Sequence, residues 1–237
     1  MIETVELTKR YGRRTAVDAL SFSVPAGQVV GFLGPNGAGK STTMRLILGL
    51  DRIDAGTALI GGLPYRAHAR PLRQVGALLE QRALHPGRTA RHHLLWLAQS
   101  NGIARARIDA VLDLVGLADV AGRRVRTFSL GMAQRLGMAA ALLGDPAALV
   151  LDEPMNGLDP EGMVWLRGLL RDLAGEGRAV LVSSHLMAEM EHLADRLVLV
   201  NAGRLVAAGT PDDLRAGHGS LETAFLDLIR TDSRRTA

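Results

Sequence analysis

The sequence has no cysteine, and aromatic residues make up only 3% of its 237 residues. Without cysteine, the chain can form neither a disulfide framework nor a thiolate metal site, which fits a reducing cytosol. With so few Phe, Trp and Tyr side chains, it has little material for the stacking platforms that bind single-stranded nucleic acid. These shortages exclude a disulfide-stapled module and make a single-strand binding protein a poor candidate.

Long apolar runs are also missing from the sequence. None approaches the roughly 18 to 20 residues that a membrane span requires, and Met1 to Gly12 lack the apolar stretch of a secretory signal. We therefore expect no secretory signal, and the chain cannot by itself form a channel. With 47% hydrophobic and 22% charged residues, the composition is that of a globular protein with a sizeable core.

The formal net charge is +4, and nearly all of the positive charge is arginine. Lys9 and Lys40 are the only lysines. The arginines are spread along the chain and do not form a run, so we interpret them as solvated surface residues. We therefore expect no nucleic-acid partner.

Two kinds of apolar pattern predict strands. Alternating apolar residues between positions 2 and 24, with turn residues at Gly12 and Pro25, are typical of antiparallel β structure. Three later runs are continuously apolar, as in parallel strands buried on both faces. These runs are Val29 to Leu33, Leu149 to Leu151 and Ala179 to Val182.

Between the apolar runs, a spacing near 3.6 residues predicts helices. We expect them at 41–48, 94–99, 108–115, 132–143 and 164–173, and a hairpin joining 197–200 to 205–207. The fold class is therefore α/β, a single domain over 1–237 with a parallel sheet and an N-terminal antiparallel β part. We expect an inserted helical subdomain at about 82–144 and a helical tail at about 210–237.

A glycine-rich loop follows the first buried strand and opens a helix. It matches the phosphate-binding (P-loop) pattern G-x-x-x-x-G-K-[ST], and this strand-to-helix context supports the match. Backbone N–H groups of such a loop surround phosphates, the lysine reaches the β and γ oxygens, and the serine hydroxyl can ligate Mg²⁺. The loop consists of Gly34, Pro35, Asn36, Gly37, Ala38, Gly39, Lys40 and Ser41, and Thr42 offers a further donor.

Two acids, Asp152 and Glu153, follow the strand that ends at Leu151. Ligands of parallel sheets bind at the carboxyl ends of strands, so both acids are candidates for the site. We expect Asp152 to hold Mg²⁺ and Glu153 to orient or deprotonate an attacking water. His185 follows the next buried strand and is expected at the same edge, within reach of the γ-phosphate.

A serine-capped helix start, Phe128-Ser129-Leu130-Gly131-Met132-Ala133-Gln134-Arg135, precedes the strand that carries Asp152. Taken with the other motifs, in order and spacing from the phosphate loop to His185, it resembles the L-S-G-G-Q motif of the ATP-binding-cassette (ABC) ATPases. This resemblance extends over nearly the whole chain.

The resemblance implies further roles. Tyr11 would stack on the adenine of ATP, Asn156 to Asp159 would form the loop at the dimer interface, and His185 would be the switch histidine. Two such domains face head to tail in this family, so Ser129 and Gly131 would contact the γ-phosphate bound by the opposite subunit. The cofactors would be ATP and Mg²⁺.

Two departures from the family pattern matter for the site. Leu130 replaces the first glycine of the motif, which disfavours a close backbone approach to phosphate there. At the position of the family's Q-loop glutamine, the alignment of Val75-Gly76 favours Glu80, whereas Gln81 lies one residue late. Glu80 is therefore a further candidate Mg²⁺ ligand, as in the drug- and bacitracin-type exporter ATPases that the chain resembles.

The function implied is the ATP-hydrolysing subunit of an exporter for a drug, antibiotic or lipid. It would be peripheral, on the cytoplasmic face of the membrane. A separate membrane permease would dock near Arg82 to Asn101, and a second copy of the chain would complete the dimer. A soluble ABC ATPase acting on ribosomes or DNA is the alternative. A phosphate-loop kinase is disfavoured by Ser129, Glu153 and His185 together.

Overall fold

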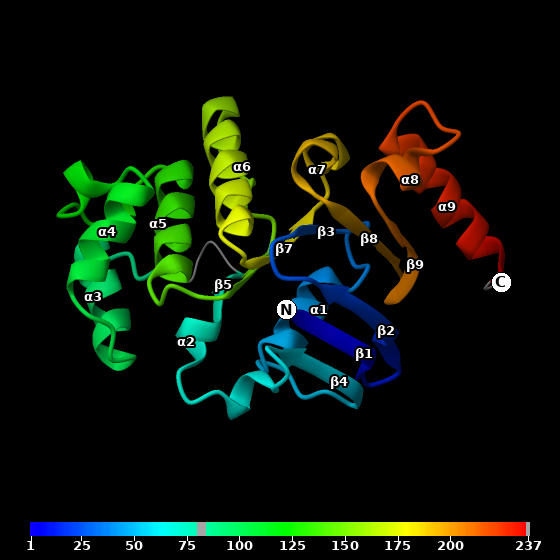
Figure 1. The fold of residues 1–237 in the computed structure, drawn as a ribbon, viewed down its shortest axis with the longest axis horizontal. Coiled ribbons are helices and arrows are strands. Elements are labelled where there is room, and N and C mark those ends of the chain that lie inside the picture. The colour runs from blue at the N-terminus through cyan, green and yellow to red at the C-terminus, as the bar shows by residue number, and fades with distance from the viewer. Residues whose placement is uncertain (80–83, 236–237) are drawn as a thin grey trace.

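The computed structural model describes residues 1–79 and 84–235, with side chains to residue 230, and contains two β-sheets (Figure 1). Three strands lie in the order β2-β1-β4, and six lie in the order β5-β6-β7-β3-β8-β9. The strands are β1 (Ile2–Tyr11), β2 (Arg14–Val24), β3 (Val29–Leu33), β4 (Ala55–Ile60), β5 (Val75–Leu78), β6 (Ala148–Leu151), β7 (Ala179–Ser184), β8 (Arg196–Asn201) and β9 (Arg204–Gly209).

The five predicted helices are all present, and each of them begins before the predicted residue. α3 (Ala90–Ser100) and α5 (Leu130–Leu142) begin after Thr89 and Ser129, whose side chains accept hydrogen bonds from the N–H groups of His92 and Met132. Apolar spacing does not register such polar caps, so it places helix starts too late. The helices are α1 (Lys40–Ile47), α2 (Pro71–Gln74), α3 (Ala90–Ser100), α4 (Ala106–Leu114), α5 (Leu130–Leu142), α6 (Pro160–Gly175), α7 (Met187–Leu193), α8 (Pro211–Arg215) and α9 (Leu221–Arg235).

The larger sheet is parallel except at one edge. The three predicted core strands are neighbours in the order β6-β7-β3, and β5 and β8 extend the parallel sheet on either side. β9 pairs antiparallel with β8, which confirms the predicted hairpin. Since the carboxyl ends of β3, β6 and β7 lie at one edge, the residues that follow them are brought together.

Two strands were not predicted from the sequence, β4 and β5. In β4 only Ala58 and Ile60 are buried, so its apolar alternation is weak. β5 is four residues long and contains Gly76. A Cβ at Gly76 would lie 2.0 Å from the carbonyl oxygen of Ala141, so glycine lets α5 pack directly on this strand.

The core lies on both faces of the larger sheet. Along β3, Val29 and Leu33 belong to one buried cluster, and Val30 and Phe32 belong to the other. Phe32 also stacks on Phe22 of β2, with ring centroids 5.1 Å apart, and this contact joins the two sheets. The burial of both faces explains why this strand is continuously apolar.

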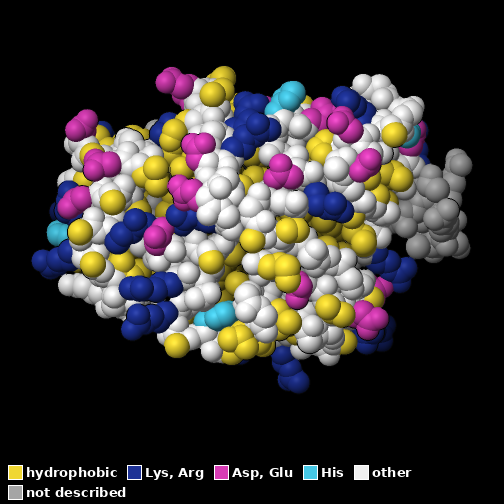
Figure 2. Space-filling view, in the orientation of Figure 1, with side chains coloured by type: hydrophobic (Ala, Val, Ile, Leu, Met, Phe, Trp, Pro, Cys, Tyr) yellow, Lys and Arg dark blue, Asp and Glu magenta, His cyan; other side chains and the backbone are white. Residues whose placement is uncertain are grey.

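The helices α3, α4 and α5 follow β5 in the chain and lie together at one end of the molecule, opposite α8 and α9 (Figure 1). On the face drawn in Figure 2, cationic and anionic side chains are interspersed with apolar ones. Within residues 1–79 and 84–235, no helix combines the length and apolar character that crossing a bilayer requires.

Candidate functional site

The phosphate loop runs from the end of β3 to the start of α1, as predicted. Its backbone depends on two glycines with positive φ, Gly37 at 81° and Gly39 at 101°. A Cβ at Gly39 would lie 2.4 Å from the carbonyl oxygen of Ala16, so no other residue fits without a shift of the backbone. The loop conformation is therefore tied to glycine at this position.

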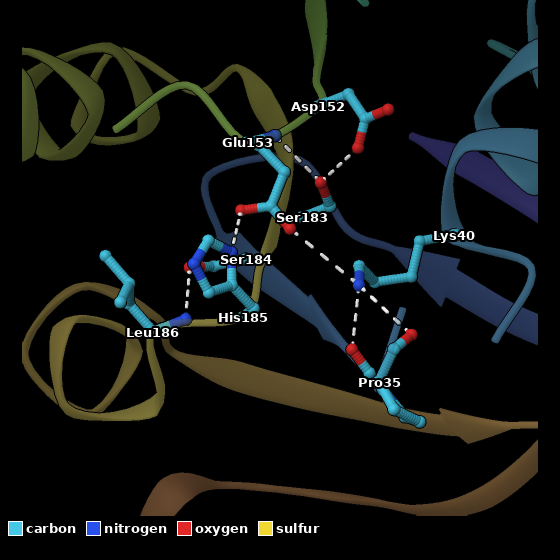
Figure 3. A network of polar contacts seen from close by, with 9 residues as sticks. Pro35, Lys40, Asp152, Glu153, Ser183, Ser184, His185 and Leu186 are labelled. Carbon is cyan, nitrogen blue, oxygen red and sulfur yellow. Dashed lines mark hydrogen bonds and ion pairs between the residues drawn. The ribbon is translucent and has the colours of Figure 1, made fainter. Parts of the chain in front are cut away.

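Lys40 is the first residue of α1, and its side chain is buried. The Nζ atom donates hydrogen bonds to the carbonyl oxygens of Gly34 at 2.7 Å and Pro35 at 3.5 Å (Figure 3). The side chain thus folds back over its own loop. This position suits a cation that serves an anion bound by the loop.

A cavity of about 410 Å³ opens above the loop and brings together most of the predicted residues. It has the size expected of a small-molecule site. Its lining residues are Tyr11, Arg14, Ala16, Pro35, Asn36, Gly37, Gly39, Lys40, Ser41, Thr42, Asp152 and Glu153.

Two predicted loop residues, Gly34 and Ala38, do not line this cavity, but they shape the loop. Gly34 accepts the hydrogen bond from Lys40, and a Cβ there would lie 2.4 Å from the carbonyl oxygen of Val200. Ala38 is buried, and its N–H donates to the carbonyl oxygen of Pro35 at 3.1 Å. Both residues therefore support the loop from the protein side.

Asp152 and Glu153 leave the end of β6 beside this cavity. The hydroxyl group of Ser183 donates a hydrogen bond to Oδ1 of Asp152 and accepts one from the backbone N–H of Glu153 at 2.9 Å (Figure 3). Glu153 has a φ of 49°, a left-handed conformation that is strained for a residue other than glycine. Ser183 thus orients one acid and holds the strained backbone of the other.

The Glu153 carboxylate lies between two groups from other elements. Its Oε2 atom is 2.7 Å from Nδ1 of His185, and its Oε1 atom is 3.7 Å from Nζ of Lys40. His185 follows β7 directly, and its side chain is half exposed. Although His185 does not line the cavity, its contact with Glu153 connects it to the loop lysine.

Ser183 has a structural part in the site that the sequence did not assign to it. It is fully buried on β7, in a strand whose other residues before Ser184 are apolar. A hydroxyl group on such a strand needs a hydrogen-bond partner. The signal available in the sequence was a pair of polar residues, Ser183 and Ser184, directly after a continuously apolar run.

Tyr11, at the end of β1, lines the cavity together with Thr42 and is half exposed. Its hydroxyl group donates a hydrogen bond to Asp51 at 2.8 Å. Partial burial and the Asp51 carboxylate both raise the pKa of this phenol above its usual value. The ring is therefore neutral and lies at the mouth of the cavity.

Ser129 and Gly131 lie outside the cavity formed by the phosphate loop and the acids. Ser129 caps α5, where it accepts a hydrogen bond from the N–H of Met132 at 3.2 Å. The half-exposed Leu130 packs over Gly157, because a Cβ built on Gly157 would come within 2.2 Å of its side chain. The leucine that departs from the family motif thus contacts the loop at 156–159.

Gln134 connects α5 to the loop at 152–159, which follows β6 and contains Asp152 and Glu153. Its side-chain amide is buried and donates a hydrogen bond to the carbonyl oxygen of Pro154 at 2.7 Å. Asp159, the last residue of that loop, caps α6 by accepting from the N–H of Gly162 at 2.7 Å. The loop is therefore fixed from both helices.

Glu80 lies outside the described residues. The strand before it, β5, pairs with β6, and the N–H of Asp152 donates to the carbonyl oxygen of Leu78 at 2.7 Å. The chain thus leaves β5 close to Asp152.

The donor set fits Mg²⁺. Ser41 contributes a hydroxyl group and Asp152 a carboxylate to the same cavity. Mg²⁺ is usually bound by one or two carboxylates together with phosphate and water oxygens, so a dense acidic cage is not needed. None of the described residues forms a cluster of three or more metal-binding side chains.

The family model for the ABC transporter matches residues 17–156. Three similar proteins are the lantibiotic transport ATP-binding protein SrtF of Streptococcus pyogenes, a Nod factor export ATP-binding protein I of Burkholderia orbicola and the bacitracin transport ATP-binding protein BcrA of Bacillus licheniformis. Their identities are 36%, 42% and 43%, over 99%, 90% and 87% of this chain and 100%, 72% and 68% of theirs.

A solved ATP-binding subunit of an ABC transporter has the same fold. It superposes with a TM-score of 0.87 at 28% identity, covering 97% of this chain and 99% of that one. These similarities confirm the predicted fold class and the resemblance to bacitracin-type ATPases. The chain therefore belongs to the ABC transporter family, as one of its ATP-binding and ATP-hydrolysing proteins.

Proposed function

We propose that this chain hydrolyses ATP to power export through a separate membrane permease, at the cytoplasmic face of the membrane. The observation that supports the chemistry is that residues of the phosphate loop line the same cavity as Asp152 and Glu153. Relatives named for lantibiotic and bacitracin transport and for Nod factor export support the direction and the class of cargo.

The phosphate loop would bind the triphosphate. Backbone N–H groups from Gly37 to Ser41 and the start of α1 favour negative charge, and Lys40 can move from its present carbonyl partners to phosphate oxygens. Tyr11, at the cavity mouth, would stack on the base. Thr42 would add a hydroxyl contact.

Ser41 and Asp152 would hold Mg²⁺, with Glu80 as a third candidate. When bound, the metal supplies positive charge that neutralises the phosphate oxygens. Asp152 is suited to this task because Ser183 fixes one of its oxygens. Since Asp152 also lines the cavity, its other oxygen would be the one that ligates the metal.

Glu153 would orient a water molecule for attack on the γ-phosphate and accept its proton. His185, at 2.7 Å, would hold this carboxylate in place and contact the γ-phosphate once ATP is bound. The contact between Lys40 and Glu153 at 3.7 Å would be replaced by phosphate. Binding of ATP would thus release Glu153 for its role in hydrolysis.

A second copy of the chain would complete the site. Ser129 caps α5 and Gly131 lies in its first turn, where the N–H groups and the helix dipole suit a phosphate. Both residues lie outside the cavity of their own chain. A head-to-tail dimer would bring them to the γ-phosphate of the partner. ATP would then bridge the two subunits.

The permease would dock in an apolar groove of about 410 Å³ beside the helices that follow β5. We assign residues 82–144 to an inserted helical subdomain that carries one wall of this groove, and residues 210–237 to a C-terminal helical tail. The groove is lined by Arg45, Leu48, Leu50, Tyr65, Leu72, Val75, Ala77, Leu78, Leu79, Leu84, His93, Trp96, Leu97, Ala133, Gly137, Ala140 and Ala141.

The test is to recover the tagged chain from detergent-solubilised membranes and identify its partners by mass spectrometry. We expect a protein with several membrane spans, retained by Leu114→Asp and lost with Trp96→Asp. Trp96 is an exposed residue of the groove, and Leu114 is an exposed residue outside it. The purified chain should hydrolyse ATP, and Lys40→Ala should not bind it. Recovery of ribosomal proteins or DNA alone would instead favour the soluble alternative.

A further inference from the structure

Tyr11 is held at its hydroxyl end by a residue from a different part of the chain. The phenol donates a hydrogen bond of 2.8 Å to Oδ2 of Asp51, which lies 40 residues later, beyond the end of α1. An exposed tyrosine otherwise rotates freely about its side-chain bonds. The contact with Asp51 therefore restricts the position of the ring at the cavity mouth.

Asp51 is itself fixed. The Nε atom of Arg45 donates to Oδ2 at 2.9 Å, and its Nη2 atom donates to Oδ1 at 3.4 Å. The hydrogen bonds from Arg45 lower the pKa of the Asp51 carboxyl group most, and the hydrogen bond from Tyr11 lowers it further. The side chain of Asp51 is 20% exposed, against 41% for Arg45. A carboxylate that is itself held by two hydrogen bonds from the Arg45 guanidinium group is a stable anchor for the phenol.

The loop at 51–54, which contains Asp51, also contributes to the surroundings of the Tyr11 ring. Lys9 is buried, and its Nζ atom lies 5.2 Å from the centroid of the Tyr11 ring, within the range of a cation–π contact. This ammonium group donates to the carbonyl oxygen of Arg52 at 2.7 Å and pairs with Asp54 at 3.6 Å. The loop at 51–54 thus fixes both the edge of the ring and the cation beside it.

We propose that Asp51 is a positioning residue that holds Tyr11 ready to stack on the nucleobase. This inference rests on the proposed role of Tyr11 in binding the base. A ring fixed before binding loses less conformational entropy when the nucleotide arrives. Loss of the anchor should therefore weaken ATP binding by about threefold to tenfold. It should leave binding of the phosphates unchanged.

The experiment compares the affinity of the full chain for ATP with its affinity for inorganic triphosphate, which has no base. Asp51→Ala and Tyr11→Phe should each weaken ATP binding by the same factor, and the double variant should be no weaker than either single one. Asp51→Asn keeps an acceptor for the phenol and should restore most of the affinity. Asp172→Ala, at an exposed aspartate of α6, is the matched control.

Each other outcome has a defined meaning. If Asp51→Ala weakens ATP and triphosphate equally, Asp51 acts on the phosphate loop through Arg45 and α1, and the inference is overturned. If Tyr11→Ala weakens ATP binding while Asp51→Ala does not, the inference also fails, although base stacking stands. If Tyr11→Ala leaves ATP binding unchanged, the proposed role of Tyr11 itself is wrong. Thermal unfolding of each variant checks that the fold is retained.

Discussion

The Nδ1 atom of His185 lies 2.7 Å from Oε2 of Glu153, although the two residues are 32 positions apart in the chain. They meet because β6 and β7 are parallel neighbours that end at the same edge of the sheet. Glu153 also lies 3.7 Å from Lys40, which follows β3. Three strand ends thus converge on one carboxylate.

Glu153→Gln should retain ATP binding but slow its hydrolysis by about 10² or more, because an amide cannot accept the proton of the attacking water. With ATP retained, the dimer should persist, as measured by size-exclusion chromatography. Glu161→Gln, at an exposed glutamate of α6, should hydrolyse ATP normally. Normal turnover by Glu153→Gln would remove its proposed role.

Ser183→Ala removes the hydroxyl group that links Asp152 and Glu153. We expect a loss of about 1–3 kcal/mol in the free energy of unfolding, since the partly buried N–H of Glu153 loses its partner. The Mg²⁺ concentration for half-maximal hydrolysis should rise, because one oxygen of Asp152 is no longer fixed. Ser184→Ala is the control, since the Ser184 hydroxyl accepts from the N–H of Leu186 instead. An equal Mg²⁺ requirement in both variants would argue against this role.

Gly39→Ala and Gly168→Ala should change stability in opposite directions. At Gly39 a Cβ meets a carbonyl oxygen at 2.4 Å and φ is 101°, so alanine should destabilise the fold by about 1–3 kcal/mol and impair ATP binding. Gly168 lies in α6 with nothing within 4 Å of its Cβ position. Alanine there should stabilise by about 0.5–1 kcal/mol. Urea unfolding measures both, and destabilisation of equal size would contradict the prediction.

The dimer arrangement predicts complementation between two inactive variants. Lys40→Ala disables the phosphate loop, and Ser129→Arg blocks the surface offered to the partner. A mixed dimer contains one site with both parts intact. We therefore expect a 1:1 mixture to recover up to about a quarter of the wild-type ATPase rate, from random pairing in a two-fold dimer. No recovery would favour a site completed within one chain.

His93 should make stability depend on pH. Burial lowers the pKa of His93 below the ordinary 6.5, and the charges of Arg88 and His85 make smaller contributions in the same direction. Between the folded and unfolded pKa values the unfolded chain binds more protons, so the free energy of unfolding falls as pH drops below about 6.5. In His93→Phe this loss should be smaller when urea unfolding is compared at pH 7.5 and 5.5. His192→Gln, at an exposed histidine, is the control; a loss in His93→Phe equal to that of the wild type would contradict the prediction.

The sequence by itself determined the local elements of the site. Gly34 to Ser41 could be recognised because the phosphate loop is formed by consecutive residues whose types are dictated by backbone geometry. Asp152 and Glu153 could be placed at the carboxyl edge of the sheet because they follow a buried strand directly. The continuously apolar runs determined the parallel sheet, since strands buried on both faces have no polar side to show.

Only the tertiary structure decided which distant side chains meet. Ser183 bridges Asp152 and Glu153, and Asp51 anchors Tyr11, through hydrogen bonds between residues about 30 and 40 positions apart. No local pattern marks such pairs, because strand order and the path of the connecting loops bring them together. Apolar periodicity reports which face is buried, but not which polar groups share that burial.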